Sequence, residues 1–68
     1  MNLDKILLKL KNHTKEITEP NSSQRNFYVL GIMNGIMGMY VQLSDEGIFS
    51  NDDIADCLEK LGDFHDGL

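Results

Sequence analysis

The sequence predicts an all-α protein with three helices. Two observations lead to this prediction. Apolar residues recur every three or four positions along most of the chain, and the breaks between these segments carry Pro, Gly and Ser, which end and cap helices. The 68 residues allow one small helical domain, residues 1–68. A chain this short buries only about 60% of the surface that its unfolded form exposes, so we expect it to need very good helix packing or a second chain.

The first helix is expected at about residues 3–17. Asn2 can cap it, because an asparagine side chain accepts a hydrogen bond from a free backbone amide of the first turn. Most of its apolar residues, together with Thr14, fall on one stripe: Leu3, Ile6, Leu7, Leu10, Thr14 and Ile17. Leu8 lies off this stripe. Pro20 disfavours helical geometry at the residue before it, so the helix ends ahead of that position.

The second helix is expected at about residues 24–46, after a cap at Ser22 or Ser23. Gly47 should end it, because glycine adopts the left-handed conformation of a helix C-cap at little steric cost. Between Phe27 and Leu43 this helix is apolar nearly all round. Such a helix in a soluble protein must be enclosed, so we expect it at the centre, with the other two helices and a further surface covering it.

The third helix is expected at about residues 51–61. Ser50 and Asp53 have the spacing of a capping box, in which each side chain accepts from the other residue's backbone amide. Its apolar positions again form one stripe: Ile54, Cys57, Leu58 and Leu61. Gly62 is expected to close this helix and to leave residues 63–68 as a frayed tail.

The sequence contains no pattern typical of a metal site, a cofactor site or an enzyme. Cys57 is the single cysteine, and the two histidines, His13 and His65, lie far apart in the chain. The stretch SDEGIFSNDD resembles a calcium loop only in composition. If Gly47 is the sixth residue of such a loop, Gln42 stands at the first position, where an aspartate oxygen is needed, and Asp53 at the twelfth, where a bidentate glutamate is usual. A free cysteine and no leader segment lead us to expect a cytoplasmic protein that has no enzymatic activity and binds neither a metal nor a cofactor.

Charge is distributed unevenly. Residues 1–43 carry five basic and three acidic side chains, whereas residues 44–68 carry one basic and eight acidic ones. An acidic end repels phosphate backbones and attracts basic protein surfaces, so we expect no direct binding to nucleic acid. An alternative function follows, that of an acidic mimic that blocks a nucleic-acid-binding surface with Asp52, Asp56, Glu59 and Asp63.

The stretch GIMNGIMG, residues 31–38, places three glycines inside the most apolar helix. Each glycine costs about 1 kcal/mol of helix propensity relative to alanine. Gly31, Gly35 and Gly38 share a strip, and a backbone that approaches them closely would compensate this cost, whether it belongs to the same chain or to another. The predicted interface comprises these glycines and their neighbours: Phe27, Leu30, Gly31, Asn34, Gly35 and Gly38. A single-span membrane peptide is a further alternative, because the apolar run reaches the lower limit for crossing a bilayer, although we expect no membrane association.

The order YVLGIMNGIMGMYVQLSDEGIFSNDDIADCLEKL, residues 28–61, resembles small all-helical proteins of bacteriophages and other mobile elements. The resemblance lies in an aromatic-x-x-Gly-x-x-x-Gly helix, a Leu-x-x-x-Gly turn and a short acidic helix. It implies a protein that acts by binding a host or phage protein. Together with the surplus apolar surface, it leads to the expected function: a small, non-catalytic, homodimeric protein that binds and modulates another protein.

Overall fold

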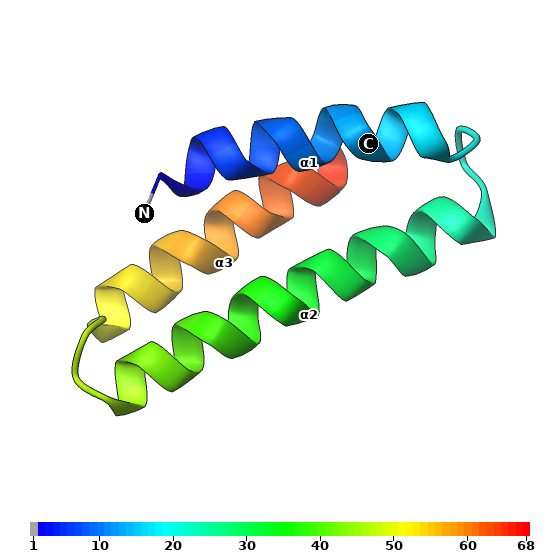
Figure 1. The fold of residues 1–68 in the computed structure, drawn as a ribbon. Helices are drawn as coiled ribbons and strands as arrows, with labels where there is room; N and C mark the ends of the chain where they lie inside the picture. The colour runs from blue at the N-terminus through cyan, green and yellow to red at the C-terminus, as the bar shows by residue number, and fades with distance from the viewer. Residues whose placement is uncertain (1) are drawn as a thin grey trace.

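The computed structural model describes residues 2–68, which form three α-helices joined by two short turns (Figure 1). Helix α1 spans Leu3–Ile17, α2 spans Ser23–Asp45 and α3 spans Asn51–Asp66. The described residues contain no strand. The predicted all-α arrangement of three helices is confirmed, and the bounds of α1 and α2 agree with those predicted to within one residue.

Each helix begins at a side chain that caps its first turn. The Asn2 side chain accepts a hydrogen bond from the Lys5 amide at 3.1 Å, and the Ser22 hydroxyl accepts one from the Arg25 amide at 3.1 Å. The capping box ahead of α3 is complete, because the Asp53 carboxylate also accepts from the backbone amide of Ser50 at 2.8 Å. These contacts satisfy backbone amides that have no partner inside a helix.

The turn after α2 has the hydrogen bonds of a Schellman motif. Gly47 has a φ of 78°, and its amide donates to the Ser44 carbonyl at 2.9 Å. The amide of Ile48 donates to the Leu43 carbonyl at 2.9 Å. This pattern satisfies the last carbonyls of the helix and reverses the chain toward α3.

The predicted end of the third helix at Gly62 is wrong. Helix α3 continues through Gly62 to Asp66, so residues 63–66 are helical and do not form the expected frayed tail. Phe64, one turn after the buried Leu61, is only 5% exposed. Burying such a side chain contributes about 2 kcal/mol or more, which exceeds the roughly 1 kcal/mol that a glycine costs inside a helix.

The core lies between α1 and α3 and against one side of α2. It consists of seven buried residues: Leu3, Leu7, Val29, Tyr40, Cys57, Leu61 and Phe64. The side chains of Cys57 and Thr14 have no exposed surface at all. Helix α3 makes extensive contacts with α2, whereas α1 and α2 contact each other least.

Helix α2 is not enclosed, contrary to the expectation from its apolar composition. Of its 23 residues, only Arg25, Val29 and Tyr40 are buried, because α1 and α3 both lie on one side of it (Figure 1). The molecule is elongated, with a radius of gyration of 12.6 Å against about 11 Å for a compact chain of this length. Its surface of 4703 Å² also exceeds the roughly 4,300 Å² of a compact monomer of this mass.

Candidate functional site on helix α2

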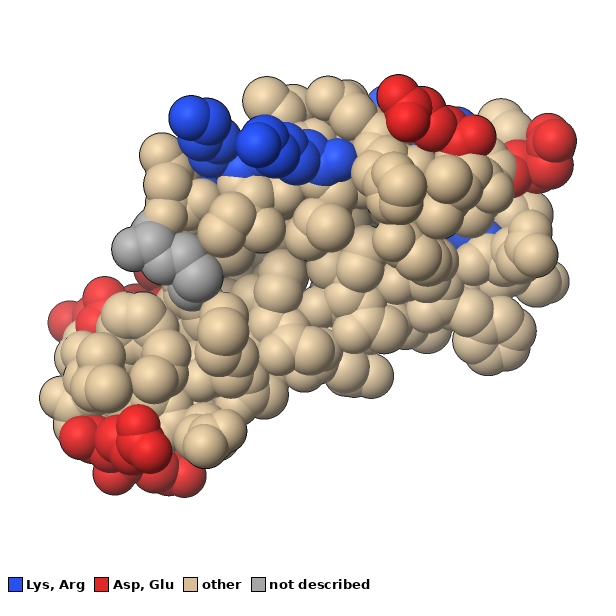
Figure 2. Space-filling view, viewed as in Figure 1, with Lys and Arg blue, Asp and Glu red and all other residues tan. Residues whose placement is uncertain are grey.

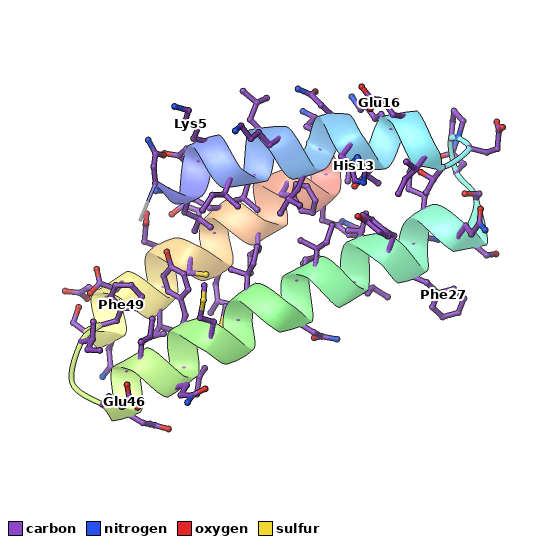
Figure 3. All side chains as sticks on the ribbon, viewed as in Figure 1. Lys5, His13, Glu16, Phe27, Glu46 and Phe49 are labelled. Carbon is purple, nitrogen blue, oxygen red and sulfur yellow. The ribbon has the colours of Figure 1, made fainter. Side chains whose placement is uncertain are left out.

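The side of α2 that points away from the core is largely apolar. Val29 and Tyr40 mark the buried side and are 3% and 7% exposed. On the opposite side Phe27 is 77% exposed and Leu30 is 50% exposed. Figure 3 shows the ring of Phe27 directed away from α1. Large apolar side chains with this exposure are candidates for contact with another molecule.

The residues of the predicted interface all lie on this exposed side. All six are exposed, and their spacing of three and four residues places them on one face of the helix. Val41, which is 45% exposed and follows Gly38 by three residues, belongs to the same face. In the sequence, its position seven residues after Asn34, two helical turns away, indicates that it shares this face. We define the α2 face as Phe27, Leu30, Gly31, Asn34, Gly35, Gly38 and Val41.

The glycines of the α2 face do not accommodate another helix of the same chain. Apart from the adjacent residues and the backbone of α2 itself, a methyl group on Gly31, Gly35 or Gly38 would meet no atom of residues 2–68 within 4 Å. The hypothesis that α1 or α3 packs closely on these glycines is therefore wrong, because both helices lie on the other side of α2. Within the described residues, no close contact compensates the cost of about 1 kcal/mol that each glycine imposes on the helix.

The α2 face carries no charge. Helix α2 has no charged side chain between Arg25 and Asp45. In Figure 2 the basic side chains gather over α1 and acidic ones gather toward the ends of the molecule, while the surface of α2 between its ends is uncharged. By length and composition alone α2 could cross a membrane, since an 18-residue window reaches a mean hydropathy of 1.2 and only 11% of it is buried.

The predicted acidic surface lies on α3. Asp52, Asp56, Glu59 and Asp63 are all exposed, and their spacing places them along one side of the helix. The Lys60 ammonium lies 3.1 Å from the Asp56 carboxylate and 3.5 Å from that of Asp4. The hydrogen bond to Asp56 raises the pKa of Lys60. Asp56 is therefore partly neutralised by its own chain.

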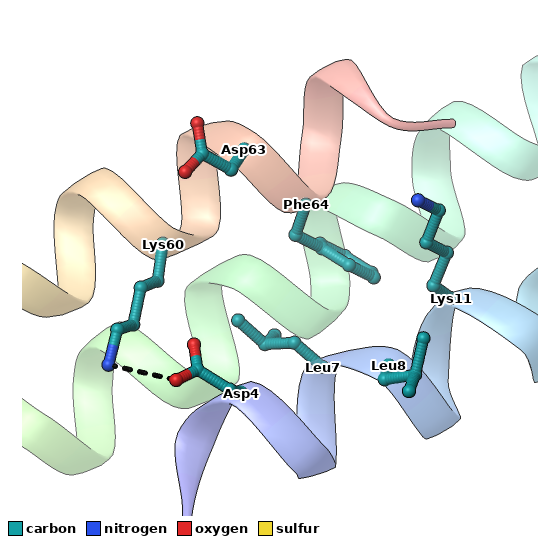
Figure 4. Close-up of a pocket in the computed structure, with 7 residues that line it drawn as sticks. All are labelled: Asp4, Leu7, Leu8, Lys11, Lys60, Asp63 and Phe64. Carbon is teal, nitrogen blue, oxygen red and sulfur yellow. Dashed lines mark ion pairs between the residues drawn. The ribbon is translucent and has the colours of Figure 1, made fainter.

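A groove of about 210 Å³ runs between α1 and α3 (Figure 4). The apolar side chains of Leu7, Leu8 and Phe64 line it together with the ion pair of Asp4 and Lys60. Lys11 and Asp63 extend it toward the end of α3 (Figure 4). Its two carboxylates are exposed, its two lysines are half-buried, and the charges are of both signs, so the groove offers no preorganised recognition of a charged ligand.

Cys57 does not have the surroundings of a nucleophile. Its side chain is fully buried, and burial raises the pKa of the thiol, with the nearby charge of Asp56 adding to the effect. A protonated thiol inside a core is unreactive, so Cys57 acts as a small apolar side chain. Within residues 2–68, no three His, Cys, Asp or Glu side chains are grouped so that they could hold a metal ion.

Comparison with known proteins assigns no family, because no protein-family model, curated protein or solved structure matches this chain. The α2 face is thus identified by its geometry and composition alone.

Proposed function

We propose that this chain is a small non-catalytic protein-binding module that forms a homodimer through the α2 face. The observation that supports the proposal is an uncharged apolar face, opposite the core, on which Phe27 is 77% exposed and Leu30 is 50% exposed. A soluble chain gains free energy by covering such a face, at about 25 cal/mol for each Å² of apolar surface removed from water. The surplus of surface over a compact monomer supports the same proposal.

A second copy of the chain fits the α2 face because the face is complementary to itself. If two α2 helices pack antiparallel with the two-fold axis at Asn34, Leu30 lies across from Gly38 of the partner subunit. Phe27 then lies across from Val41 of the partner subunit. Each large side chain meets a smaller one, and the two Asn34 amides, which both donate and accept hydrogen bonds, meet at the axis.

The size of the required contact is compatible with this chain. A stable interface buries about 800 Å² on each partner, which is roughly one-sixth of the 4703 Å² that the chain exposes. The α2 face extends over about four helical turns from Phe27 to Val41. Because the face has no charged side chain, no like charges are brought together across the two-fold axis.

Sedimentation equilibrium tests the dimer. We expect the unmodified chain to be dimeric at micromolar concentration and Leu30→Glu to be monomeric, because each copy would place a carboxylate in an apolar contact. Leu58→Glu is the matched control: Leu58 is 57% exposed, but it lies on α3, outside the α2 face. A folded unmodified chain that stays monomeric at millimolar concentration would disprove the proposal.

Cysteine cross-linking tests the antiparallel orientation. An equimolar mixture of Phe27→Cys and Val41→Cys should form the mixed disulfide faster than either variant cross-links to itself, because these positions face each other. The native Cys57 is fully buried and gives little background. Faster self-linking of Phe27→Cys would instead indicate parallel helices and would reject the antiparallel arrangement.

The partner that such a dimer modulates would be a host or phage protein, on the resemblance of residues 28–61 to small phage proteins.

A second candidate function, an acidic mimic of nucleic acid, is favoured by the exposed stripe of Asp52, Asp56, Glu59 and Asp63. Neutralising these four residues together should abolish binding to a basic nucleic-acid-binding protein at low salt. Unchanged binding would remove this candidate.

The apolar length of α2 also motivates a test against membrane insertion. A cytoplasmic dimer should remain in the supernatant when it is mixed with neutral phospholipid vesicles and centrifuged. Leu30→Glu should behave in the same way. If the unmodified chain sediments with the vesicles and Leu30→Glu does not, a membrane-bound role for α2 is favoured over the dimer.

A further inference from the structure

We propose that the chain also has a binding pocket for a small oxyanion, a phosphate or carboxylate group, at the end of the bundle where the α1–α2 turn approaches the end of α3. Helix α3 runs back toward this turn (Figure 1). A cavity of about 190 Å³ lies there, and residues of the turn, α2 and the end of α3 line it: Asn21, Arg25, Asn26, Val29, His65 and Leu68. This site is separate from the α2 face.

The central group of the pocket is the guanidinium of Arg25, a residue that is only 7% exposed. Its Nε donates to the Thr18 hydroxyl at 2.9 Å, and its Nη2 donates to the Thr18 carbonyl at 3.1 Å. The Thr18 hydroxyl donates in turn to the Thr14 carbonyl at 2.6 Å. These bonds hold one edge of the guanidinium against the end of α1, so its position is fixed before any ligand binds.

The other edge of the guanidinium has no hydrogen-bond acceptor within the part of the chain that the structure describes. The bonds to Thr18 use two of the five donors of an arginine side chain, and Nη1 makes none within residues 2–68. Among those residues, every fully buried side-chain nitrogen or oxygen has a hydrogen-bond partner. Because Nη1 has no partner, it is not fully buried and is open to water. Arg25 as a whole is only 7% exposed, and it lines the cavity. We therefore infer that Nη1 faces the cavity and is reached through it.

Among residues 2–68, Arg25 forms no ion pair. The ion pairs among residues 2–68 involve only Lys60 and His65 as cations. Buried charges are normally paired, because removing them from water is costly. Arg25 is also the third residue of α2, where the positive end of the helix dipole disfavours a cation, and the first turn of α2 has no acidic residue. A bound anion would offset both unfavourable terms.

The lining supplies the remaining requirements of an oxyanion site. A guanidinium edge presents two parallel N–H groups that match two oxygens of a phosphate or carboxylate group. Asn21 and Asn26 contribute amide side chains that can donate to a third oxygen, and the His65 ring closes the pocket from α3. None of the lining side chains is acidic, and the terminal carboxylate of Leu68 forms no ion pair with Arg25. Asp66, which lies 3.4 Å from the His65 ring nitrogen, is not among the lining residues.

A titration followed by NMR tests the pocket. Inorganic phosphate, and acetate in a separate series, are added to the ¹⁵N-labelled protein while sodium chloride keeps the ionic strength constant. We expect saturable shifts of the Arg25 Nε–H and of the Asn21 and Asn26 side-chain amides. Saturation by phosphate alone identifies a phosphate group as the ligand, and saturation by acetate alone identifies a carboxylate. Shifts that do not saturate, or that spread evenly over the molecule, overturn the proposal.

A charge introduced into the lining provides the decisive variant. Asn26→Asp changes an exposed side chain at nearly constant volume and places a carboxylate beside Arg25, so it should weaken binding of the anion by about tenfold or more. Asn12→Asp makes the same change at an exposed position of α1 outside the pocket and should leave the affinity unchanged. Equal affinities of these two variants would overturn the proposal without any change to the buried arginine.

Discussion

The ring of Phe49 stacks on the ring of Tyr40, with centroids 4.6 Å apart and planes 27° from parallel. Tyr40 belongs to the core side of α2, and Phe49 lies in the turn that leads to α3. The pair therefore joins the turn to the packed helices. Aromatic pairs of this kind contribute about 0.5–1.5 kcal/mol beyond the burial of their surface.

Replacing Phe49 by alanine should lower the free energy of unfolding by about 2–3 kcal/mol, because it removes both the stack and a half-buried apolar side chain. Urea unfolding followed by circular dichroism measures the loss. Ile48→Ala is the control, since Ile48 is the neighbouring residue and is 60% exposed. Its effect should stay within about 0.5 kcal/mol. Equal losses in both variants would show that the stack does not contribute.

Removing the cap of α3 should also destabilise the chain. Ser50→Ala deletes the hydroxyl that accepts from the Asp53 amide, at a cost of about 1 kcal/mol in the free energy of unfolding. Asn51→Ala alters the next, exposed residue, which does not cap the helix, and should have little effect. Urea unfolding again measures both variants. A Ser50→Ala protein as stable as the Asn51→Ala protein would mean that the capping box is energetically unimportant.

Two glycines should respond to alanine in opposite directions. Gly47 has a φ of 78°, a conformation that strains any residue with a Cβ, so Gly47→Ala should destabilise the chain by about 1 kcal/mol or more. Gly62 lies inside α3, and a methyl group there meets nothing within 4 Å, so Gly62→Ala should stabilise it by about 1 kcal/mol. Thermal unfolding of the two variants side by side checks both signs, and a shared sign would contradict this reading of the backbone.

The glycines of the α2 face separate a monomer from a dimer. A methyl group on Gly38 has free space within the chain, so Gly38→Ala should raise the stability of a monomer by about 1 kcal/mol. In the proposed dimer the same methyl group enters a close contact, at a cost of about 1–3 kcal/mol. We therefore expect the thermal-unfolding midpoint of Gly38→Ala to rise less with protein concentration than that of the unmodified chain.

Thermal unfolding at two protein concentrations about a hundredfold apart measures this difference, because association makes the midpoint depend on concentration. The Gly62→Ala variant should keep the concentration dependence of the unmodified chain, since Gly62 lies on α3. If neither the unmodified chain nor Gly38→Ala changes its midpoint with concentration, the α2 face is not a dimer interface.

Stability should fall as the pH rises above about 9. Burial raises the pKa of the Cys57 thiol above its ordinary value of 9.0, so the unfolded chain loses this proton at a lower pH than the folded chain does. Burial likewise raises the pKa of Tyr40 above 10.0, which adds to the fall at higher pH. Protons held only by the folded state make the free energy of unfolding decrease with pH.

Urea unfolding from about pH 8 to pH 10 measures this slope. Cys57→Ala should be less stable at the lower pH, because it leaves a small cavity, but its stability should fall less steeply as the pH rises. Equal slopes in the two proteins would show that the thiol keeps its ordinary pKa in the folded state. The comparison depends on the slope alone, so the cavity does not obscure it.

Local sequence determined where the helices lie in this protein. Helix caps and left-handed turn residues act on backbone groups only a few residues away; in this protein they are Asn2, Ser22, Ser50 and Gly47. The bounds of α1 and α2 could therefore be predicted from the sequence to within one residue. The candidate interface was also accessible from sequence, because residues three and four apart share a helix face wherever that helix is placed.

Only the tertiary structure decided which faces are covered. The burial of Phe64 extends α3 past a glycine that should have ended it, and the packing of α1 and α3 on one side leaves the glycine face of α2 open. Arg25 looks like any surface arginine in the sequence, but its burial against Thr18 depends on how α1 meets α2. Periodicity specifies which residues share a side of a helix, whereas the free energy of packing against segments distant in the chain decides which side faces water.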